Sequence, residues 1–132
     1  MSLNFPFDPI KRSKETEAVV MQGEKRLYFR FRCSAHYGGI ITGDSVGCNV
    51  CCAYCWNFQK NLNPVRGEFY SPAEVIAKLK AESMRSGYQL FRVSAGEPIL
   101  GKRSAMHLAQ VLRAFPGRFF VETNGLAIGR NP

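Results

Sequence analysis

Two kinds of periodicity divide this chain into strands and helices. Residues 25–33 alternate between apolar side chains and tyrosine or arginine, a pattern that predicts a half-buried strand. The alternating sets are Leu27, Phe29 and Phe31 on one face and Tyr28, Arg30 and Arg32 on the other. We interpret the basic face, which also carries Arg26, as the solvent side of an edge strand, where arginine hinders aggregation. The alternative is a stripe that binds phosphate or nucleic acid.

Further along the chain, strands and helices alternate. Ser71 and Glu74 have the spacing of a capping box with Pro72 at the first helical position, which predicts a helix that ends near Ser86. Apolar residues at positions 105, 108, 109 and 112 predict a second helix, and His107 falls outside its apolar stripe, so we expect His107 at the surface. The expected order is a strand at 40–44, a turn or flexible segment at 61–67, a helix at 72–86, a strand at 89–94, a helix at 104–115 and a strand at 118–123.

This alternation predicts an α/β fold, because strands separated by helices usually pair in parallel through right-handed crossovers. Ligands of such sheets bind at the carboxyl ends of the strands. Three motifs follow the three expected strands: a cysteine-rich loop at 47–57, Ala95-Gly96-Glu97-Pro98, and Glu122-Thr123-Asn124-Gly125. We therefore expect one composite site at this edge of the sheet.

The composition fits a single globular domain, with 45% hydrophobic and 12% aromatic residues in a chain of 132. No segment approaches the roughly 18 consecutive apolar residues of a membrane span. The N-terminus lacks a signal-peptide pattern, so we expect a cytoplasmic protein without a membrane partner. The formal net charge of +8 favours anionic partners such as nucleic acid, but we prefer to interpret it as a solvated basic surface.

Cysteines carry the strongest chemical signal, since four of the five lie at positions 48, 51, 52 and 55. Cys48, Cys52 and Cys55, spaced C-x3-C-x2-C, can hold three irons of a [4Fe–4S] cluster and leave the fourth open. Two adjoining C-x2-C pairs can instead bind zinc, although such pairs are normally a dozen or more residues apart. A redox pair or disulfide is the third interpretation, but no βαβ unit precedes the loop. The lone Cys33 is expected to be a small buried residue.

The order C-x3-C-x-aromatic-C, with Tyr54 in the aromatic position, resembles the signature of the radical S-adenosylmethionine (radical SAM) superfamily. Gly96-Glu97 resembles the Gly-Gly-Glu motif of that family, with Ala95 in place of the first glycine. The segment at 122–125 is similar to the third-strand motif of its activating-enzyme branch. An aromatic residue and an asparagine after the last cysteine also occur in the activating and RNA-modifying branches.

The resemblance implies a reaction and its cofactors. Cys48, Cys52 and Cys55 would bind a [4Fe–4S] cluster whose open iron takes the amino and carboxylate groups of S-adenosyl-L-methionine. An electron from a flavodoxin-type or ferredoxin-type donor would cleave this compound to methionine and a 5′-deoxyadenosyl radical, which abstracts hydrogen from a substrate. The substrate is unknown, with a protein and an RNA as the candidates. The alternative function is a non-catalytic module that binds an iron–sulfur cluster or zinc.

Four further residues would contact the cofactor in a protein of this family, and the resemblance assigns no other catalytic side chain. Tyr54 would pack near the adenine, and Gly96 would allow close approach of the backbone. The Glu97 carboxylate would accept a charge-assisted hydrogen bond from the methionine ammonium. Asn124 would contact the cofactor or the substrate.

The family fold is a full or partial (β/α) barrel. This chain resembles its N-terminal half, with about three parallel βα units and an extra N-terminal strand. We expect an N-terminal extension over residues 1–36, which contains that strand, and the half-barrel over residues 37–132. Half a barrel exposes an apolar sheet edge, so we also expect an oligomer or a missing C-terminal half.

Overall fold

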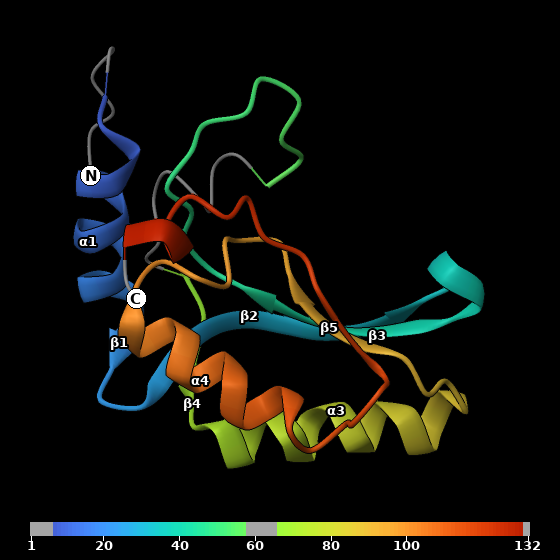
Figure 1. Cartoon of the computed structure of the whole chain (residues 1–132). Helices are drawn as coiled ribbons and strands as arrows, with labels where there is room; N and C mark the ends of the chain where they lie inside the picture. The colour runs from blue at the N-terminus through green and yellow to red at the C-terminus, as the bar shows by residue number, and fades with distance from the viewer. Residues whose placement is uncertain (1–6, 58–65, 131–132) are drawn as a thin grey trace.

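Short helices and strands alternate along the chain and build a mixed α/β fold (Figure 1). The computed structural model describes residues 7–57 and 66–130, so most of the expected turn at 61–67 lies outside the described residues. In chain order the elements are α1 (Pro9–Val20), β1 (Met21–Gln22), β2 (Lys25–Ser34), the 3-10 helix η1 (His36–Gly38), β3 (Ile40–Ser45), β4 (Glu68–Tyr70), α3 (Pro72–Ser86), β5 (Phe91–Ser94), α4 (Lys102–Leu112), β6 (Phe119–Val121) and the 3-10 helix η2 (Ile128–Arg130). None of the described helices is both long and apolar enough to cross a membrane.

The strands form one sheet in the order β1-β2-β3-β5-β6, with β4 also paired to β2, and the sheet curls as part of a barrel. β3, β5 and β6 are parallel, which confirms the pairing predicted for the strands that alternate with helices. β1, β2 and β4 join the sheet in antiparallel fashion. β1 and β4 were not expected, because strands of two or three residues are too short to show a periodicity.

One face of the sheet packs on α3 and α4, which lie on the same side of it (Figure 1). Ile41, Phe91 and Val93 point to this face, and the ring of Phe91 stacks on that of Phe115 with centroids 3.9 Å apart. Residues between them in the sequence, such as Thr42 and Arg92, take the opposite face because side chains alternate along a strand. This opposite face is therefore polar. A second, smaller core under α1 contains Val20, Leu27, Val46 and Leu100.

The helices α3 and α4 begin with side-chain caps. Ser71 and Glu74 form the predicted capping box, with hydrogen bonds of 3.0 and 3.2 Å between each side chain and the other residue's main-chain N–H. α4 begins at Lys102, two residues before the expected start. The reason is Ser104, whose hydroxyl accepts hydrogen bonds from the main-chain N–H groups of Leu100 and Gly101 and so caps the helix from its third position.

β2 is not the edge strand that the sequence predicted. It pairs with β3 on one side and with β1 and β4 on the other, so that prediction is wrong. The register with β3 shifts between Tyr28 and Arg30, which interrupts the alternation with period two. As a result Phe31 lies with Tyr28, and their rings stack with centroids 5.4 Å apart.

Two side chains of β2 contradict their expected exposure. Arg26 is buried, because three main-chain carbonyl groups accept hydrogen bonds from its guanidinium in the interior. Cys33 is exposed instead of buried. It lies one residue before the end of β2, opposite Ile41 of β3.

His107 is also buried, which contradicts the surface position expected for it. Its side chain bridges Tyr28 and Glu24, with 2.8 Å between Nε2 and the Tyr28 hydroxyl and 2.8 Å between Nδ1 and the Glu24 carbonyl oxygen. A carbonyl can only accept, so Nδ1 carries the proton and Nε2 accepts from Tyr28. Burial lowers the pKa of His107 to about 4, so this imidazole is neutral at pH 7.

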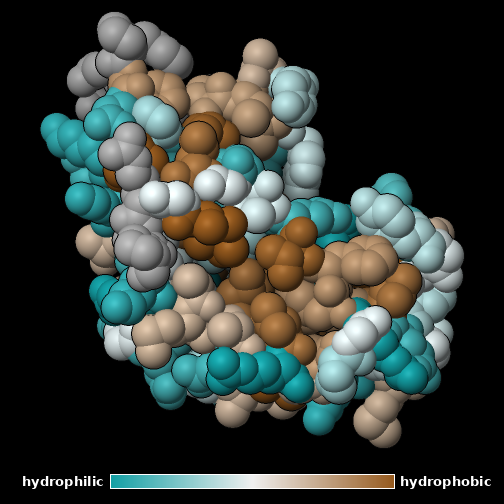
Figure 2. Space-filling view, viewed as in Figure 1, coloured by the Kyte–Doolittle hydropathy of each residue, from teal (hydrophilic) through white to brown (hydrophobic). Residues whose placement is uncertain are grey.

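The other end of the sheet exposes apolar side chains, as expected. β6 is the last strand in the sheet order, and Val121 and Phe120 are exposed there, as are Leu126 and Ile128 after it. Figure 2, viewed as in Figure 1, shows hydrophobic side chains gathered near the middle of this face. In Figure 1 the C-terminal part of the chain crosses the same face. The proposed division at residue 36 stays a prediction.

Candidate functional site

Glu97 lies in the loop after β5, and its side chain holds that loop to the segment after β6. Only 3% of the residue is exposed. The carboxylate accepts a hydrogen bond from the Thr123 hydroxyl. Its Oε1 also accepts one from the main-chain N–H of Asn124, with 3.0 Å between the nitrogen and the oxygen. Burial raises the pKa of Glu97, and these hydrogen bonds oppose the shift. Two of the three motifs expected at this edge of the sheet are thus in direct contact.

Asn124 connects the same segment to the cysteine loop. Its Nδ2 donates a hydrogen bond of 2.7 Å to Oδ1 of Asn49, the residue that follows Cys48. Asn49 is fully buried, and its own Nδ2 donates to the Ser13 hydroxyl of α1 at 3.1 Å. The expected proximity of the three motifs is therefore confirmed. The buried asparagine at the centre of this connection was not among the residues predicted from the sequence.

Gly96 lies against the backbone of the cysteine loop. A Cβ atom at this position would lie 2.5 Å from the carbonyl oxygen of Gly47, closer than such atoms approach in proteins. The main-chain N–H of Glu97 donates a 2.9 Å hydrogen bond to the same oxygen. The absence of a side chain at Gly96 thus lets the two loops touch. Ala95, which precedes it, has a φ of 74°, in the left-handed region that favours glycine.

Arg26 connects the segment before the cysteine loop to the Glu97 loop through hydrogen bonds to main-chain carbonyls. It is 2% exposed, and its Nη2 donates to the carbonyl oxygens of Val46 at 2.9 Å and Glu97 at 3.0 Å, while Nη1 lies 3.4 Å from that of Pro98. Burial lowers the pKa of this arginine. One guanidinium therefore fixes the segment before the cysteine loop relative to the Glu97 loop. The regular alternation of β2 gave no sign of this role, because the acceptors are backbone atoms distant in sequence.

The four cysteines of the loop are half-buried and form no disulfide. The main-chain N–H of Cys55 donates to the Cys52 carbonyl at 3.1 Å, which closes a turn between these two residues. Burial raises the pKa of the Cys48 thiol, whereas hydrogen bonds from the backbone of Val50 and Asn49 oppose this. Free thiols are the donors that iron–sulfur clusters require, so the residues present fit such a cluster in their chemistry.

The described residues of the loop do not form a preformed metal site. Within residues 7–57 and 66–130, no three histidine, cysteine, aspartate or glutamate side chains are grouped closely enough to bind a metal ion. Tyr54, expected beside the cofactor, is 90% exposed. The structure therefore brings together Gly96, Glu97 and Asn124 with the start of the cysteine loop, and leaves Tyr54 in solvent.

A comparison with known protein families finds a match that covers most of the residues in these contacts. A family model described as the radical SAM superfamily matches residues 44–130, which is more than half of the 132-residue chain. The matched segment includes the cysteine loop, Glu97 and Asn124. Two further comparisons, with curated proteins and with solved structures, find no match.

Proposed function

The chain belongs to the radical SAM superfamily, and from this membership we propose that it takes part in radical chemistry on S-adenosyl-L-methionine. Cys48, Cys52 and Cys55 would hold a [4Fe–4S] cluster. When bound and reduced, such a cluster supplies the electron for cleavage of S-adenosylmethionine to methionine and a 5′-deoxyadenosyl radical that removes hydrogen from a substrate. The remaining parts of the site bind and orient the cofactor and substrate.

The environment of Glu97 is the observation that best supports this proposal. Its buried carboxylate is hydrogen-bonded to neutral donors, Thr123 and Asn124, and forms no ion pair within the described part of the chain. Arg26 bonds its main-chain carbonyl, not its carboxylate. The positive charge of Arg26 lowers the pKa of Glu97 but forms no ion pair with the carboxylate. An incoming cation in direct contact would stabilise this buried anion further, and the ammonium of S-adenosylmethionine is such a group.

The contacts between the loops explain how the chain would position this cofactor. The Glu97 loop touches the cysteine loop through Gly96 and is fixed to it by Arg26. Asn124 is bonded to both loops, through its main-chain N–H to Glu97 and through its amide to Asn49. A molecule bound by the thiolate-held group and by Glu97 would thus meet parts of the chain that are fixed relative to each other.

Anaerobic reconstitution with iron and sulfide tests the proposal. We expect a brown protein with about four irons per chain, a change in its visible spectrum when S-adenosylmethionine is added, and 5′-deoxyadenosine after reduction with dithionite. Glu97→Gln should weaken S-adenosylmethionine binding and leave the iron content unchanged, because glutamine keeps the shape without the charge. The matched control Glu15→Gln changes an exposed glutamate of α1 in the same way and should bind normally.

A colourless protein with one tightly bound zinc would contradict the proposal and favour the non-catalytic module. A flavodoxin-type or ferredoxin-type protein would donate the electron in a reducing compartment such as the cytoplasm, and the substrate would be a protein, an RNA or a smaller molecule. The motif at 122–125 resembles the activating-enzyme branch, and the residues after Cys55 fit both that branch and the RNA-modifying branch.

A further inference from the structure

The polar face of the sheet contains a pocket lined by arginine side chains. It has a volume of about 400 Å³, and its walls include Arg30, Arg32, His36, Trp56, Arg92 and Glu122. Trp56 follows Cys55 directly, so the pocket adjoins the cysteine loop. The predicted roles of the cysteines, Glu97 and Asn124 make no use of this pocket.

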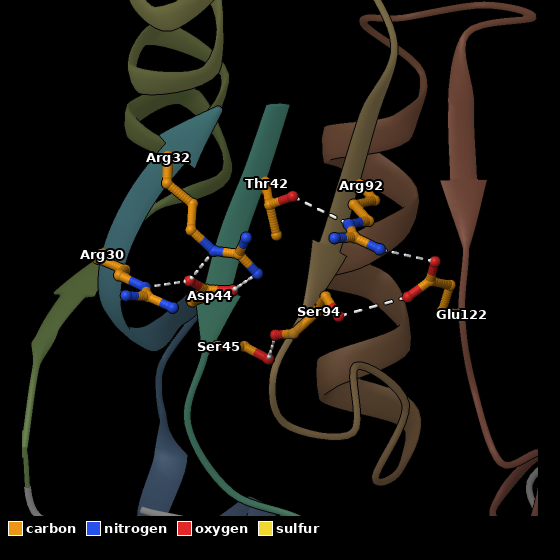
Figure 3. Close-up of polar contacts among 8 residues, drawn as sticks. All are labelled: Arg30, Arg32, Thr42, Asp44, Ser45, Arg92, Ser94 and Glu122. Atoms are coloured by element: carbon orange, nitrogen blue, oxygen red, sulfur yellow. Dashed lines mark hydrogen bonds and ion pairs between the residues drawn. The ribbon is translucent and has the colours of Figure 1, made fainter. Parts of the chain in front are cut away.

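Arg30 and Arg32 converge on one buried carboxylate (Figure 3). Asp44 is fully buried in β3, and its Oδ2 accepts from Nε of Arg30 at 2.5 Å and from Nε of Arg32 at 2.7 Å. Because one negative charge meets two guanidinium groups, Arg30, Arg32 and Asp44 together keep an excess of one positive charge. Both Nη groups of Arg30 have no hydrogen-bond partner among the described residues. The side chain of Arg30 is 46% exposed and lines the pocket.

Arg92 occupies the other side of the pocket and is held at two points (Figure 3). Its Nε donates to the Thr42 hydroxyl at 2.9 Å and its Nη1 to Oε1 of Glu122 at 3.0 Å. The Ser94 hydroxyl donates to the other carboxylate oxygen of Glu122 at 3.3 Å. The geometry of this arginine is therefore fixed before any ligand arrives, which reduces the entropy lost on binding.

From these contacts we propose that the pocket binds the carboxylate or phosphate group of a small anionic substrate. Three guanidinium groups face two carboxylates, which leaves a net positive charge, and the planar guanidinium fork matches both kinds of oxyanion. This inference rests on the proposed function, for which it names the class of substrate. A substrate held there would lie beside the loop where the radical is generated.

The shape of the site favours a small molecule over a nucleic acid. The arginines converge on one open pocket, and its volume of about 400 Å³ lies within the range of sites for small ligands. A nucleic-acid surface instead spreads its cations along a groove or stripe to follow successive phosphates. Trp56, whose ring lies 5.5 Å from the guanidinium carbon of Arg30 and 5.9 Å from that of Arg32, adds a flat apolar wall.

Trp56 is the only tryptophan of the chain and lies in the pocket, so its fluorescence reports binding. The full chain is titrated with inorganic phosphate and with malonate, and calorimetry measures the same affinities independently. We expect saturable binding of at least one anion and binding about tenfold weaker in Arg30→Gln, the loss typical of one charge-assisted hydrogen bond. Arg30→Lys, which keeps the charge without the fork, should lose less. Arg113→Gln removes an exposed charge elsewhere and should bind as the unchanged chain does.

Three results would overturn the proposal. In the first, neither anion binds, or Arg30→Gln and Arg113→Gln weaken binding equally. In the second, only S-adenosylmethionine gives a signal that depends on Arg30, which would make the pocket a site for the cofactor carboxylate. In the third, only a single-stranded RNA oligonucleotide gives that signal.

These titrations need no cluster, so their failure is distinct from failure of the proposed function. If the chain binds an anion but never assembles a cluster, the proposal for the pocket stands and the proposed radical chemistry fails. If the reconstituted chain yields 5′-deoxyadenosine but binds no anion, the proposed function stands and the proposal for the pocket fails.

Discussion

Asn124 donates a 2.7 Å hydrogen bond from its side-chain amide to Oδ1 of Asn49, across 75 residues of sequence. Asn49 is fully buried next to Cys48, and Asn124 also bonds Glu97 through its main-chain N–H at 3.0 Å. This pair of asparagines therefore connects the cysteine loop with the segment after β6. Two of the three motifs of the composite site are thus joined directly by side-chain hydrogen bonding and not only through the sheet.

Replacement of Asn124 by alanine should loosen that connection. The substitution removes the hydrogen bond to the side-chain oxygen of Asn49; because Asn124 is exposed, water can take its place, and the loss of stability should be about 0.5–1.5 kcal/mol. Urea unfolding of the full chain measures the loss, and S-adenosylmethionine binding to the reconstituted protein should weaken with it. Gln110→Ala, which removes an exposed amide from α4, is the control and should change neither quantity much.

Ala95→Gly should stabilise the protein. Ala95 has a φ of 74°, and the left-handed conformation costs a non-glycine residue about 1–2 kcal/mol. The greater freedom of glycine in the unfolded chain offsets about 0.4–1 kcal/mol of this, so the net gain should be roughly 0.5–1 kcal/mol. Ala81→Gly in the exposed middle of α3 should instead lower stability by about 1 kcal/mol. A loss in both variants would show that Ala95 is not strained.

Gly96→Ala should separate the two loops. The added Cβ would lie 2.5 Å from the Gly47 carbonyl oxygen, a backbone atom that cannot rotate away. We expect a loss of stability of about 1–3 kcal/mol from the forced shift, together with weaker S-adenosylmethionine binding in calorimetry. Gly129→Ala is the matched control, because nothing lies within 4 Å of the added carbon there. Equal behaviour of the two variants would contradict the close contact.

Cys52→Ala should abolish cluster assembly, whereas Cys51→Ala should be tolerated. The family spacing uses Cys48, Cys52 and Cys55, so one of three ligands is lost in the first variant and none in the second. Iron and sulfide content after anaerobic reconstitution, with the visible spectrum, measures the difference. The reverse result would mean that the ligand assignment is wrong.

His107 should make stability depend on pH. The pKa of His107 is about 4 in the folded chain and 6.5 in the unfolded chain. Between these pH values the unfolded chain binds a proton at His107 and the folded chain does not. The free energy of unfolding should thus fall as the pH falls below 6.5, by up to about 3 kcal/mol at pH 4. Urea unfolding across this range should show the fall in the unchanged chain and in His36→Gln.

His107→Gln should flatten that profile, since glutamine does not titrate. His36 is exposed and is the second of only two histidines, which makes it the natural control. An identical pH profile in His107→Gln and in the unchanged chain would show that the buried histidine does not titrate as described.

The sequence by itself determined the elements whose signals are local. The capping box of Ser71 and Glu74 joins residues three apart, and the helix that follows begins and ends as predicted. The parallel strands and their shared carboxyl edge followed from the alternation of strands with helices, and the contact of Glu97 with Asn124 agrees with that expectation. The cysteine spacing and the motif at Glu97 were likewise enough to indicate the family.

Only the tertiary structure decided which polar side chains are buried and what they hold. Arg26, His107 and Asn49 have partners about 20 to 85 positions away in the chain, so no local pattern distinguishes them from surface residues. The register shift in β2 likewise depends on β3, and it moved Phe31 to the side of Tyr28. Residue type and spacing are properties of the chain, whereas burial and hydrogen bonding arise where distant segments meet and each buried polar group must find a partner.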